Sequence, residues 1–248
     1  GAPWADSATE QTHLEALGAL IAKVDRQLAS LPLTGADVEA LTAPFRWNML
    51  QAADLRSALS LLPGTSVAAS CERVLDDFAI GMLPRLRELP QQVIHNDAND
   101  YNVIVDGHVV ALIDYGDLVI GPRIVGLAVA AAYLCLDKPD PIGAIQPLVR
   151  GYHEAAPLTP NELALLLPLM RTRLAMSVLN AAEQLAASPD NEYLAISQGS
   201  VPDALRVLEQ VDDGFALARL RHACGYQGIP TSYSVRQFLR SKIGRAHV

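Results

Sequence analysis

The stretch from Val93 to Asp117, VIHNDANDYNVIVDGHVVALIDYGD, constrains the fold more than any other part of this chain. Its alternation of apolar and polar residues predicts short strands separated by polar loops. In order, the predicted elements are a strand at Val93-Ile94, a polar loop at His95–Asn102, strands at Val103–Val105 and Val109–Ile113, and a second loop at Asp114–Asp117. The dipeptide Asp106-Gly107 accepts the backbone angles of a tight hairpin turn. The hairpin would therefore hold two acidic loops next to each other.

The polar residues of these loops have the spacing of a phosphate-transfer site. Asp97 lies two residues after His95, and Asn102 follows five residues after Asp97. This order matches the kinase catalytic loop, and Asp114-Tyr115-Gly116 stands where kinases carry Asp-Phe-Gly. A carboxylate such as Asp97 can orient a hydroxyl nucleophile and accept its proton. Because Mg²⁺ takes oxygen ligands, Asn102 and Asp114 are candidate ligands of the metal that holds the ATP phosphates.

At these loops the chain resembles the aminoglycoside phosphotransferase and choline kinase-like family, which are small-molecule relatives of protein kinases. Members carry the motifs His-x-Asp…Asn and Ile-Asp-x-x-Asp, which are present here in His95–Asn102 and Ile113–Asp117. The resemblance covers Trp47–Ala187 well. It implies ATP- and Mg²⁺-dependent phosphotransfer to a hydroxyl of a small molecule, such as an amino alcohol, a hydroxy amino acid or an aminoglycoside-like compound. It also implies that Asp97 is catalytic.

One subgroup of this family is most similar to the chain in two segments, His95–Asp100 and Arg221–Gly225. In that subgroup the phosphotransferase domain precedes metallopeptidase-like and aminotransferase domains, and relatives act as hydroxylysine or amino-alcohol kinases. The resemblance therefore names fused downstream domains as candidate partners. The chain departs from the family at Gly126, where members usually have an Asp that anchors the catalytic loop. The rigidity of that loop is therefore in question.

Outside the hairpin, apolar residues recur at three- and four-residue steps and predict helices. The predicted helices are Ser7–Leu31, Asn48–Leu62, Ser66–Leu89 with a bend at Pro84, Ile124–Leu136, Ile142–Glu154, the helix after Thr159 to Ala187, Asn191–Val211 and Asp213–Cys224. Gly and Pro residues in Leu33–Phe45 predict a connector. The expected fold class is mainly α (α+β), the C-terminal lobe of a protein-kinase-like fold, with helices around a small β-hairpin that carries the catalytic and metal loops.

The region before Trp47 has neither a Gly-rich loop nor a strand-borne lysine, both of which the N-terminal lobe of a kinase supplies. The lysines are Lys23, Lys138 and Lys242, and none of them has the sequence context of a phosphate-pairing lysine. We therefore expect residues 1–242 to form the C-terminal lobe, with the N-terminal lobe as a missing partner. Residues 243–248 resemble a non-native tail.

Composition limits the classes of partner. Half of the 248 residues are hydrophobic, and the net charge of −8 argues against a nucleic-acid face. The apolar run Ile124–Leu136 is too short to span a bilayer. Cys71, Cys135 and Cys224 are widely spaced and predict neither a disulfide framework nor a zinc site. We expect a cytoplasmic protein with no nucleic-acid or membrane partner.

Several side chains of the loops allow two interpretations. His95 either packs and hydrogen-bonds behind the loop or acts as a base. Asp117 either orients the substrate or braces the loop. Asn99 and Asp100 either contact an amine-bearing substrate or cap a turn. Arg171 and Arg173, in the middle of an apolar helix, are expected to extend to solvent or to pair with carboxylates.

Three classes of function follow from these interpretations. The favoured one is phosphotransfer carried by Asp97, Asn102 and Asp114 with Mg²⁺. The second is a non-catalytic kinase-like module of a multidomain protein that binds a metabolite or a partner domain. The third is a metal-dependent hydrolase that uses His95, Asp97 and Asp114, and the lack of a further His/Asp pair at metal spacing argues against it. The simplest structural alternative is a polar turn in which the aspartates only cap backbone groups.

Overall fold

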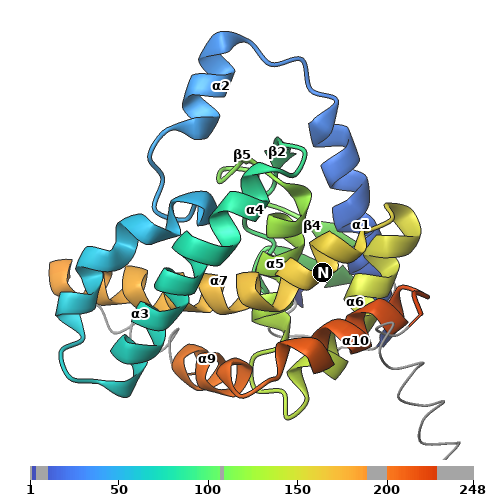
Figure 1. Ribbon diagram of the computed structural model, residues 1–248. Helices are drawn as coiled ribbons and strands as arrows, with labels where there is room; N and C mark the ends of the chain where they lie inside the picture. The colour runs from blue at the N-terminus through green and yellow to red at the C-terminus, as the bar shows by residue number, and fades with distance from the viewer. Residues whose placement is uncertain (1, 4–10, 107–108, 189–199, 228–248) are drawn as a thin grey trace, which may run out of the picture.

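The computed structural model describes residues 2–3, 11–106, 109–188 and 200–227, and most of these are helical (Figure 1). The helices are α1 (Gln11–Ala29), α2 (Gly35–Thr42), the 3₁₀ helix η2 (Met49–Leu61), α3 (Ser66–Asp77), the π-helical turn η3 (Phe78–Met82), α4 (Leu83–Arg87), α5 (Arg123–Leu134), α6 (Pro141–Ala155), α7 (Pro160–Ala187), α9 (Val201–Glu209) and α10 (Asp213–Ala223). The helix-rich, hairpin-containing architecture predicted from the sequence is therefore present.

Two small antiparallel sheets occupy the centre of the chain. β2 (Gln92–Ile94) pairs with β5 (Val119–Gly121), while β3 (Val103–Asp106) pairs with β4 (Val109–Leu112). A short strand β1 (Ala2–Pro3) pairs with the other edge of β3, which gives the order β1-β3-β4. The two sheets together bring the ends of β2 and β4 into one region.

The hairpin register differs by one position from the predicted turn. Asp106 is the last residue of β3 and pairs with Val109, and Val103 pairs with Leu112 at the other end. Asp106 is thus part of the strand, and residues 107 and 108, which connect the two strands, are outside the described residues. Val103, Val105 and Leu112 face the core, so the side-chain alternation of the strands buries one face of the hairpin.

Helix α7 crosses the middle of the molecule, and most of the other helices pack around it (Figure 1). Helices α5, α3, η2, α9 and α10 all contact it. Helix α5 is apolar on every face and almost fully buried, as its sequence predicted. The hydrophobic core therefore surrounds α7, and the hairpin packs against α1.

Helices α1 and α6 approach each other closely because glycines stand at their contact. A Cβ atom on Gly18 would lie 2.0 Å from the carbonyl oxygen of Leu148, and a Cβ atom on Gly151 would lie 2.0 Å from that of Glu15. Neither distance leaves room for a side chain, and backbone atoms cannot easily give way. The two glycines thus set the spacing of α1 and α6.

The predicted helix Ser66–Leu89 is divided into α3, η3 and α4. In the middle segment the N–H of Leu83 donates to the carbonyl of Phe78, five residues earlier. Pro84 follows directly and has no N–H to donate. The π-helical turn thus occurs where proline interrupts the regular hydrogen-bond series, so the predicted bend takes the form of a widened turn.

The segment Leu33–Phe45 is not a plain connector, since it contains α2. Thr34 caps this helix through a capping box: its side chain accepts from the Asp37 N–H, and the Asp37 carboxylate accepts from the Thr34 N–H. None of the α2 side chains is buried, and Figure 1 shows the helix standing apart from the main body, above β5. The cap signal was present in the sequence but was outweighed by Gly35 and Pro44.

Three predictions fall partly on positions that the structure does not describe. These positions are residues 7–10 of the first predicted helix, 191–199 of the helix before α10, and the proposed tail 243–248. A further difference is that the predicted helix Asn48–Leu62 is a 3₁₀ helix, η2. Within the described residues, every helix is too short or too polar to cross a bilayer.

Candidate active site

The two acidic loops are connected along the chain by the hairpin strands and are also linked directly by a backbone hydrogen bond. β2 leads into His95–Asn102, and β4 leads into Asp114–Asp117, which continues into β5. The N–H of Ile113 donates to the carbonyl of Asn102 over 2.9 Å. The end of the first loop is thus hydrogen-bonded to the beginning of the second, as the hairpin prediction required.

Each loop begins its turn with a left-handed residue. Asn96 has φ 62° and Asp114 has φ 59°, a conformation that Asn and Asp accept more readily than most residues. Asn96 is fully buried, and its Nδ2 donates to the carbonyl of Trp47 over 3.2 Å. Backbone angles of this kind concentrate at functional sites and need surrounding contacts to persist.

His95 connects the two loops with both of its ring nitrogens. Its Nδ1 accepts from the N–H of Asp97 over 3.3 Å, and its Nε2 lies 3.1 Å from the carbonyl of Ile113. Since a carbonyl only accepts, the ring carries its proton on Nε2. Burial lowers the pKa of His95 below its usual value, which keeps the ring neutral. The ring of Tyr115 packs edge-on against it at 4.7 Å. His95 is placed as a brace behind the loop.

The Asp97 carboxylate is held by three side chains. Its Oδ2 accepts from Nδ2 of Asn102 over 2.7 Å and from Nδ2 of Asn99 over 3.0 Å. Its Oδ1 accepts from Nη2 of Arg173 over 2.8 Å. Asn102 also donates to the backbone carbonyl of Asp97 over 2.9 Å. The carboxylate is therefore fixed in orientation while 16% of its side chain stays exposed to solvent.

Asn99 and Asp100 lie at the tip of the first loop. Oδ1 of Asn99 accepts from the N–H groups of Tyr101 and Asn102, which is the pattern of an Asx turn. Asp100 is half-buried in this turn. Asn99 therefore caps the turn, as one of its two interpretations expected, and it also donates to the Asp97 carboxylate.

The second loop places two carboxylates near the first loop. Asp114 is exposed, and its Oδ1 accepts from the N–H of Gly116 over 3.1 Å. Asp117 is half-buried, and this burial raises its pKa. The charges of Asp97 and Asp114 raise that pKa further, whereas the guanidinium of Arg173 lowers it. Three carboxylates and one cation therefore act on the same small region.

The oxygen atoms of this region fit a Mg²⁺ ion that is shared with phosphates. Among the described residues, no donor is hydrogen-bonded to Oδ1 of Asn102 or to Oδ2 of Asp114. A pair of protein ligands is what Mg²⁺ uses when a nucleotide and water supply the rest. Within the described ranges, no group of three or more His, Cys, Asp and Glu side chains could enclose a metal. Both His95 nitrogens are engaged, which opposes the hydrolase interpretation.

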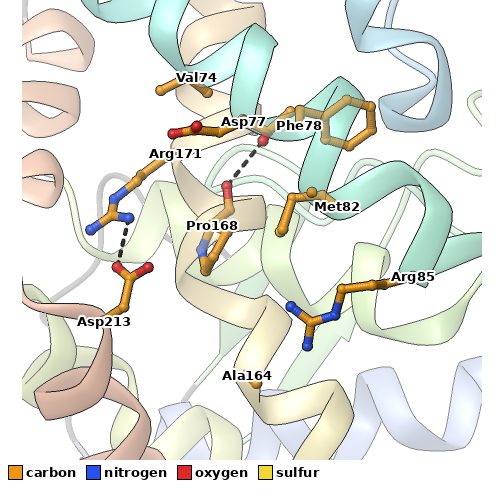
Figure 2. A pocket seen from close by; sticks show the side chains of 11 residues that line it. Val74, Asp77, Phe78, Met82, Arg85, Ala164, Pro168, Arg171 and Asp213 are labelled. Carbon is orange, nitrogen blue, oxygen red and sulfur yellow. Dashed lines mark hydrogen bonds and ion pairs between the residues drawn. The ribbon is translucent and has the colours of Figure 1, made fainter.

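Two arginines near the middle of α7 serve different parts of the molecule. Arg171 pairs with Asp213 over 2.7 Å at the edge of a cavity of about 350 Å³, whose other walls include Phe78 and Pro168 (Figure 2). That cavity contains no residue of the two acidic loops. Arg173 points to Asp97 instead and is only 2% exposed. The sequence indicated a carboxylate partner for these arginines but not that it would be Asp97.

Known proteins are similar to this chain in sequence. The sequence profile of the phosphotransferase enzyme family matches residues 1–166. The chain belongs to the phosphotransferase enzyme family. Hydroxylysine kinase from Xenopus laevis is 26% identical over 209 residues, which cover 79% of this chain and 56% of that protein. The chain thus spans about half the length of the curated relatives it matches.

Solved structures of small-molecule kinases have a similar fold. A choline/ethanolamine kinase family protein from Mesorhizobium loti aligns with a TM-score of 0.57 at 17% identity, over 87% of this chain and 70% of that one. A microcompartment-associated aminopropanol kinase aligns with a TM-score of 0.56 at 17% identity, over 89% of this chain and 66% of that one. The mainly helical, kinase-like fold predicted from the sequence is confirmed.

At Gly126, where the resemblance predicts an anchoring Asp, the buried carboxyl group of Asp25 lies nearby. A Cβ atom on Gly126 would lie 3.9 Å from Cβ of Ile94 and 4.0 Å from Oδ1 of Asp25. Oδ2 of Asp25 accepts from the Tyr152 hydroxyl over 2.6 Å, and its backbone carbonyl accepts from Nε2 of Gln92 over 2.8 Å. Burial raises the pKa of Asp25 to about 7. The carboxyl of Asp25 is thus bonded to Tyr152, its backbone carbonyl holds Gln92 of β2, and the His95 imidazole braces the loop itself.

A pocket of about 240 Å³ adjoins the second loop. One wall is the end of α2 and the residues after it, including Leu41, Pro44 and Phe45, and the other runs from Gly116 to Val119. Asp117 is the charged residue among its lining side chains. Apart from Asp117 and a glycine, the residues that line the pocket carry apolar side chains, and the pocket lies next to the loop that also carries Asp114.

Proposed function

We propose that this chain carries the catalytic and metal-binding part of an ATP- and Mg²⁺-dependent kinase that phosphorylates a hydroxyl of a small molecule. The observation that carries the proposal is the fixed orientation of the Asp97 carboxylate beside Asn102 and Asp114. In a structural turn a carboxylate would need only one or two backbone donors. Here Asn99, Asn102 and Arg173 all converge on it, while part of it stays open to solvent.

Asp97 is the residue that handles the acceptor hydroxyl. The hydroxyl donates to the carboxylate, its oxygen attacks the γ-phosphorus of ATP, and the bond from that phosphorus to the β,γ-bridging oxygen breaks to release ADP. The hydroxyl proton passes to Asp97. Since both of its oxygens are already held, Asp97 needs little rearrangement before the transfer.

Asn102 and Asp114 are the residues that would hold Mg²⁺. When bound, the ion would offset the negative charge of the ATP phosphates. The amide of Asn102 donates to Asp97 and directs its oxygen elsewhere, so one side chain serves both the base and the metal. Asp114 presents its second oxygen from an exposed loop. The two ligands thus come from the two loops that the hairpin joins.

The acceptor is proposed to be a small amino alcohol or hydroxy amino acid. The pocket beside the second loop offers an apolar wall and the carboxylate of Asp117, which suits a short carbon chain with an ammonium group. Burial and two neighbouring carboxylates raise the pKa of Asp117, and an ammonium group would relieve this repulsion. The names of the hydroxylysine kinase and aminopropanol kinase relatives support the same class.

The test is ADP formation by the complete protein with paired acceptors. 1-Amino-2-propanol is compared with 1,2-propanediol, which lacks the amine, and 5-hydroxylysine is compared with lysine, which lacks the hydroxyl. We expect turnover that depends on both groups and on Mg²⁺. Binding of an amine without any turnover would instead favour a non-catalytic binding module.

A further inference from the structure

Arg173 is a charged side chain in a place where charge is costly. It lies in the buried middle of α7 and is 2% exposed, with Leu174, Ala175 and Met176 following it in the core. A buried guanidinium must be paired and hydrogen-bonded, because an unpaired charge inside the core strongly destabilises the fold. Its buried position therefore requires a partner of opposite charge, and the Asp97 carboxylate is that partner, at 2.8 Å.

The guanidinium is fixed by three separate parts of the chain. Its Nη2 donates to Asp97, its Nη1 donates to the carbonyl of Trp47 over 3.4 Å, and its Nε donates to the hydroxyl of Tyr133 over 3.3 Å. Trp47 precedes η2, and Tyr133 lies on α5. One planar group thus connects the loop to two helices and to its own helix α7, which a lysine with a single ammonium could not do equally well.

Aromatic rings close the space around this group. Cζ of Arg173 lies 4.6 Å from the centre of the Trp47 ring and 5.5 Å from that of the Tyr133 ring. The Tyr133 hydroxyl is in turn 2.8 Å from Oγ of Ser177. The Ser177 hydroxyl donates to the backbone carbonyl of Arg173 over 3.1 Å. Both the position and the orientation of the guanidinium are therefore determined before any ligand binds.

These contacts leave Arg173 little access to a ligand. At 2% exposure it cannot serve as the surface that binds phosphate or substrate, so its effect must pass through Asp97. It occupies Oδ1 of that carboxylate, while Asn99 and Asn102 occupy Oδ2. Loss of Arg173 would leave the carboxylate held on one oxygen only and free to rotate.

We propose that Arg173 is a positioning residue, which fixes the Asp97 carboxylate in the orientation that receives the acceptor hydroxyl. This role rests on the proposed kinase function. It predicts that Arg173 sets kcat, because it acts on the group that handles the proton. The affinity for ATP and the requirement for Mg²⁺ depend on Asn102 and Asp114 and should change little.

The experiment compares Arg173→Met and Arg173→Lys in the complete protein, with Arg171→Met and Arg171→Lys as matched controls on the same helix. Arg171 also pairs with an aspartate, Asp213, but away from the loops. We expect Arg173→Met to lower kcat about 100-fold, with KM for ATP within about twofold of wild type. Arg173→Lys should recover about a tenth of the wild-type kcat, and both Arg171 variants should keep kcat.

A double-mutant cycle separates positioning from a general loss of structure. If Arg173 acts through Asp97, then Arg173→Met should lower kcat little further in an Asp97→Asn background. Additive losses, or equal losses in kcat and ATP affinity, would overturn the role. A kcat for Arg173→Met within about threefold of the wild-type kcat would also overturn the role.

Folding failure and failure of the proposed function give different results. If Arg173→Met does not fold, the test compares kcat of Arg173→Lys with kcat of Arg171→Lys. Equal kcat values for these two variants overturn the proposal. A folded wild-type protein that transfers phosphate to no hydroxyl overturns the kinase function itself, and the role of Arg173 falls with it. An active wild type with unaffected Arg173 variants overturns the role alone.

Discussion

The two acidic loops differ in how the protein holds them. In the first loop, His95 and Asn96 are buried, and the Asp97 carboxylate is held by three side chains. In the second loop, Tyr115 is 45% exposed, and within the described part of the chain Asp114 makes a single hydrogen bond, to its own loop. One loop is fixed from within the protein, whereas the other presents its oxygens to solvent.

The difference indicates a division of roles. A group that must meet a hydroxyl in one orientation gains from being fixed in advance, because the cost of ordering it has already been met during folding. A metal ligand on an exposed loop can adjust when Mg²⁺ and phosphates arrive, and it avoids the cost of a buried, unpaired carboxylate. The following substitutions test this contrast between a fixed loop and an adjustable one.

The largest effect is expected for Asp97→Asn in the complete protein. The amide cannot accept the hydroxyl proton, so kcat should fall at least about 10³-fold. Nucleotide binding should stay nearly intact because Asp97 does not hold the phosphates. Steady-state kinetics and calorimetry with ATP and Mg²⁺ measure both quantities. A loss of only a few-fold in kcat would remove Asp97 from the proton-accepting role.

Asp114→Ala should act on the metal instead. It removes a ligand from the adjustable loop, so the Mg²⁺ concentration for half-maximal activity should rise about 100-fold, which corresponds to about 2.7 kcal/mol. Asp54→Ala is a matched control, because it removes an exposed carboxylate of η2, outside both loops. An unchanged Mg²⁺ dependence in Asp114→Ala would show that the ligand lies elsewhere.

His95→Gln tests the brace of the fixed loop. It disrupts the bonds to the Asp97 N–H and the Ile113 carbonyl, so the free energy of unfolding should fall by about 2 kcal/mol at pH 7.5. Urea unfolding measures this loss. A change of less than about 0.5 kcal/mol in the free energy of unfolding would show that the loop does not depend on the ring. His222→Gln, at an exposed position of α10, is the control and should leave stability unchanged.

The same histidine makes stability depend on pH. The pKa of His95 is lowered by burial, so below about pH 6.5 the unfolded chain binds a proton that the folded protein resists. This contribution to stability is complete above pH 6.5 and is lost as the pH falls toward the lowered pKa. Between pH 7.5 and 5.5 the wild type should therefore lose more stability than His95→Gln. Equal losses would contradict the sign.

The smallest effects are expected at Tyr115, in the exposed loop. Its ring packs edge-on against His95, so Tyr115→Phe, which keeps the ring, should change the free energy of unfolding by less than about 0.5 kcal/mol. Tyr115→Ala should cost about 1 kcal/mol. Thermal unfolding of the two variants side by side measures the contribution of the ring. Equal values would show that the contact between the rings is not stabilising.

The sequence was most informative where the contacts are local. The strands, the order of the loops and the proximity of Asp97, Asn102 and Asp114 all follow from a span of about two dozen residues. Turn chemistry and alternation act over such distances, so they can be read from the chain directly. The roles of these residues stay a prediction, since geometry alone does not measure them.

The partners of the site could not be predicted because they come from distant parts of the chain. Arg173 follows Asp97 by 76 residues, and Trp47 precedes it by about 50. Asp25 reaches the position beside Gly126 from the first long helix. A buried charge in an apolar helix indicates that a partner exists but does not identify it. Only the packing of α1, α5 and α7 decides which carboxylate meets which donor.

The close crossing of α1 and α6 bears on how the protein tolerates mutation. Gly151 is followed directly by Tyr152, whose hydroxyl holds Asp25, and Asp25 in turn holds Gln92 of β2. Any side chain at Gly18 or Gly151 would push these helices apart and loosen the strand that leads into His95. A screen for loss of activity should therefore recover substitutions at two glycines that touch no ligand. In a family alignment, invariant glycines at these positions would reflect the close packing of two helix backbones. They could easily be mistaken for catalytic or ligand-binding positions.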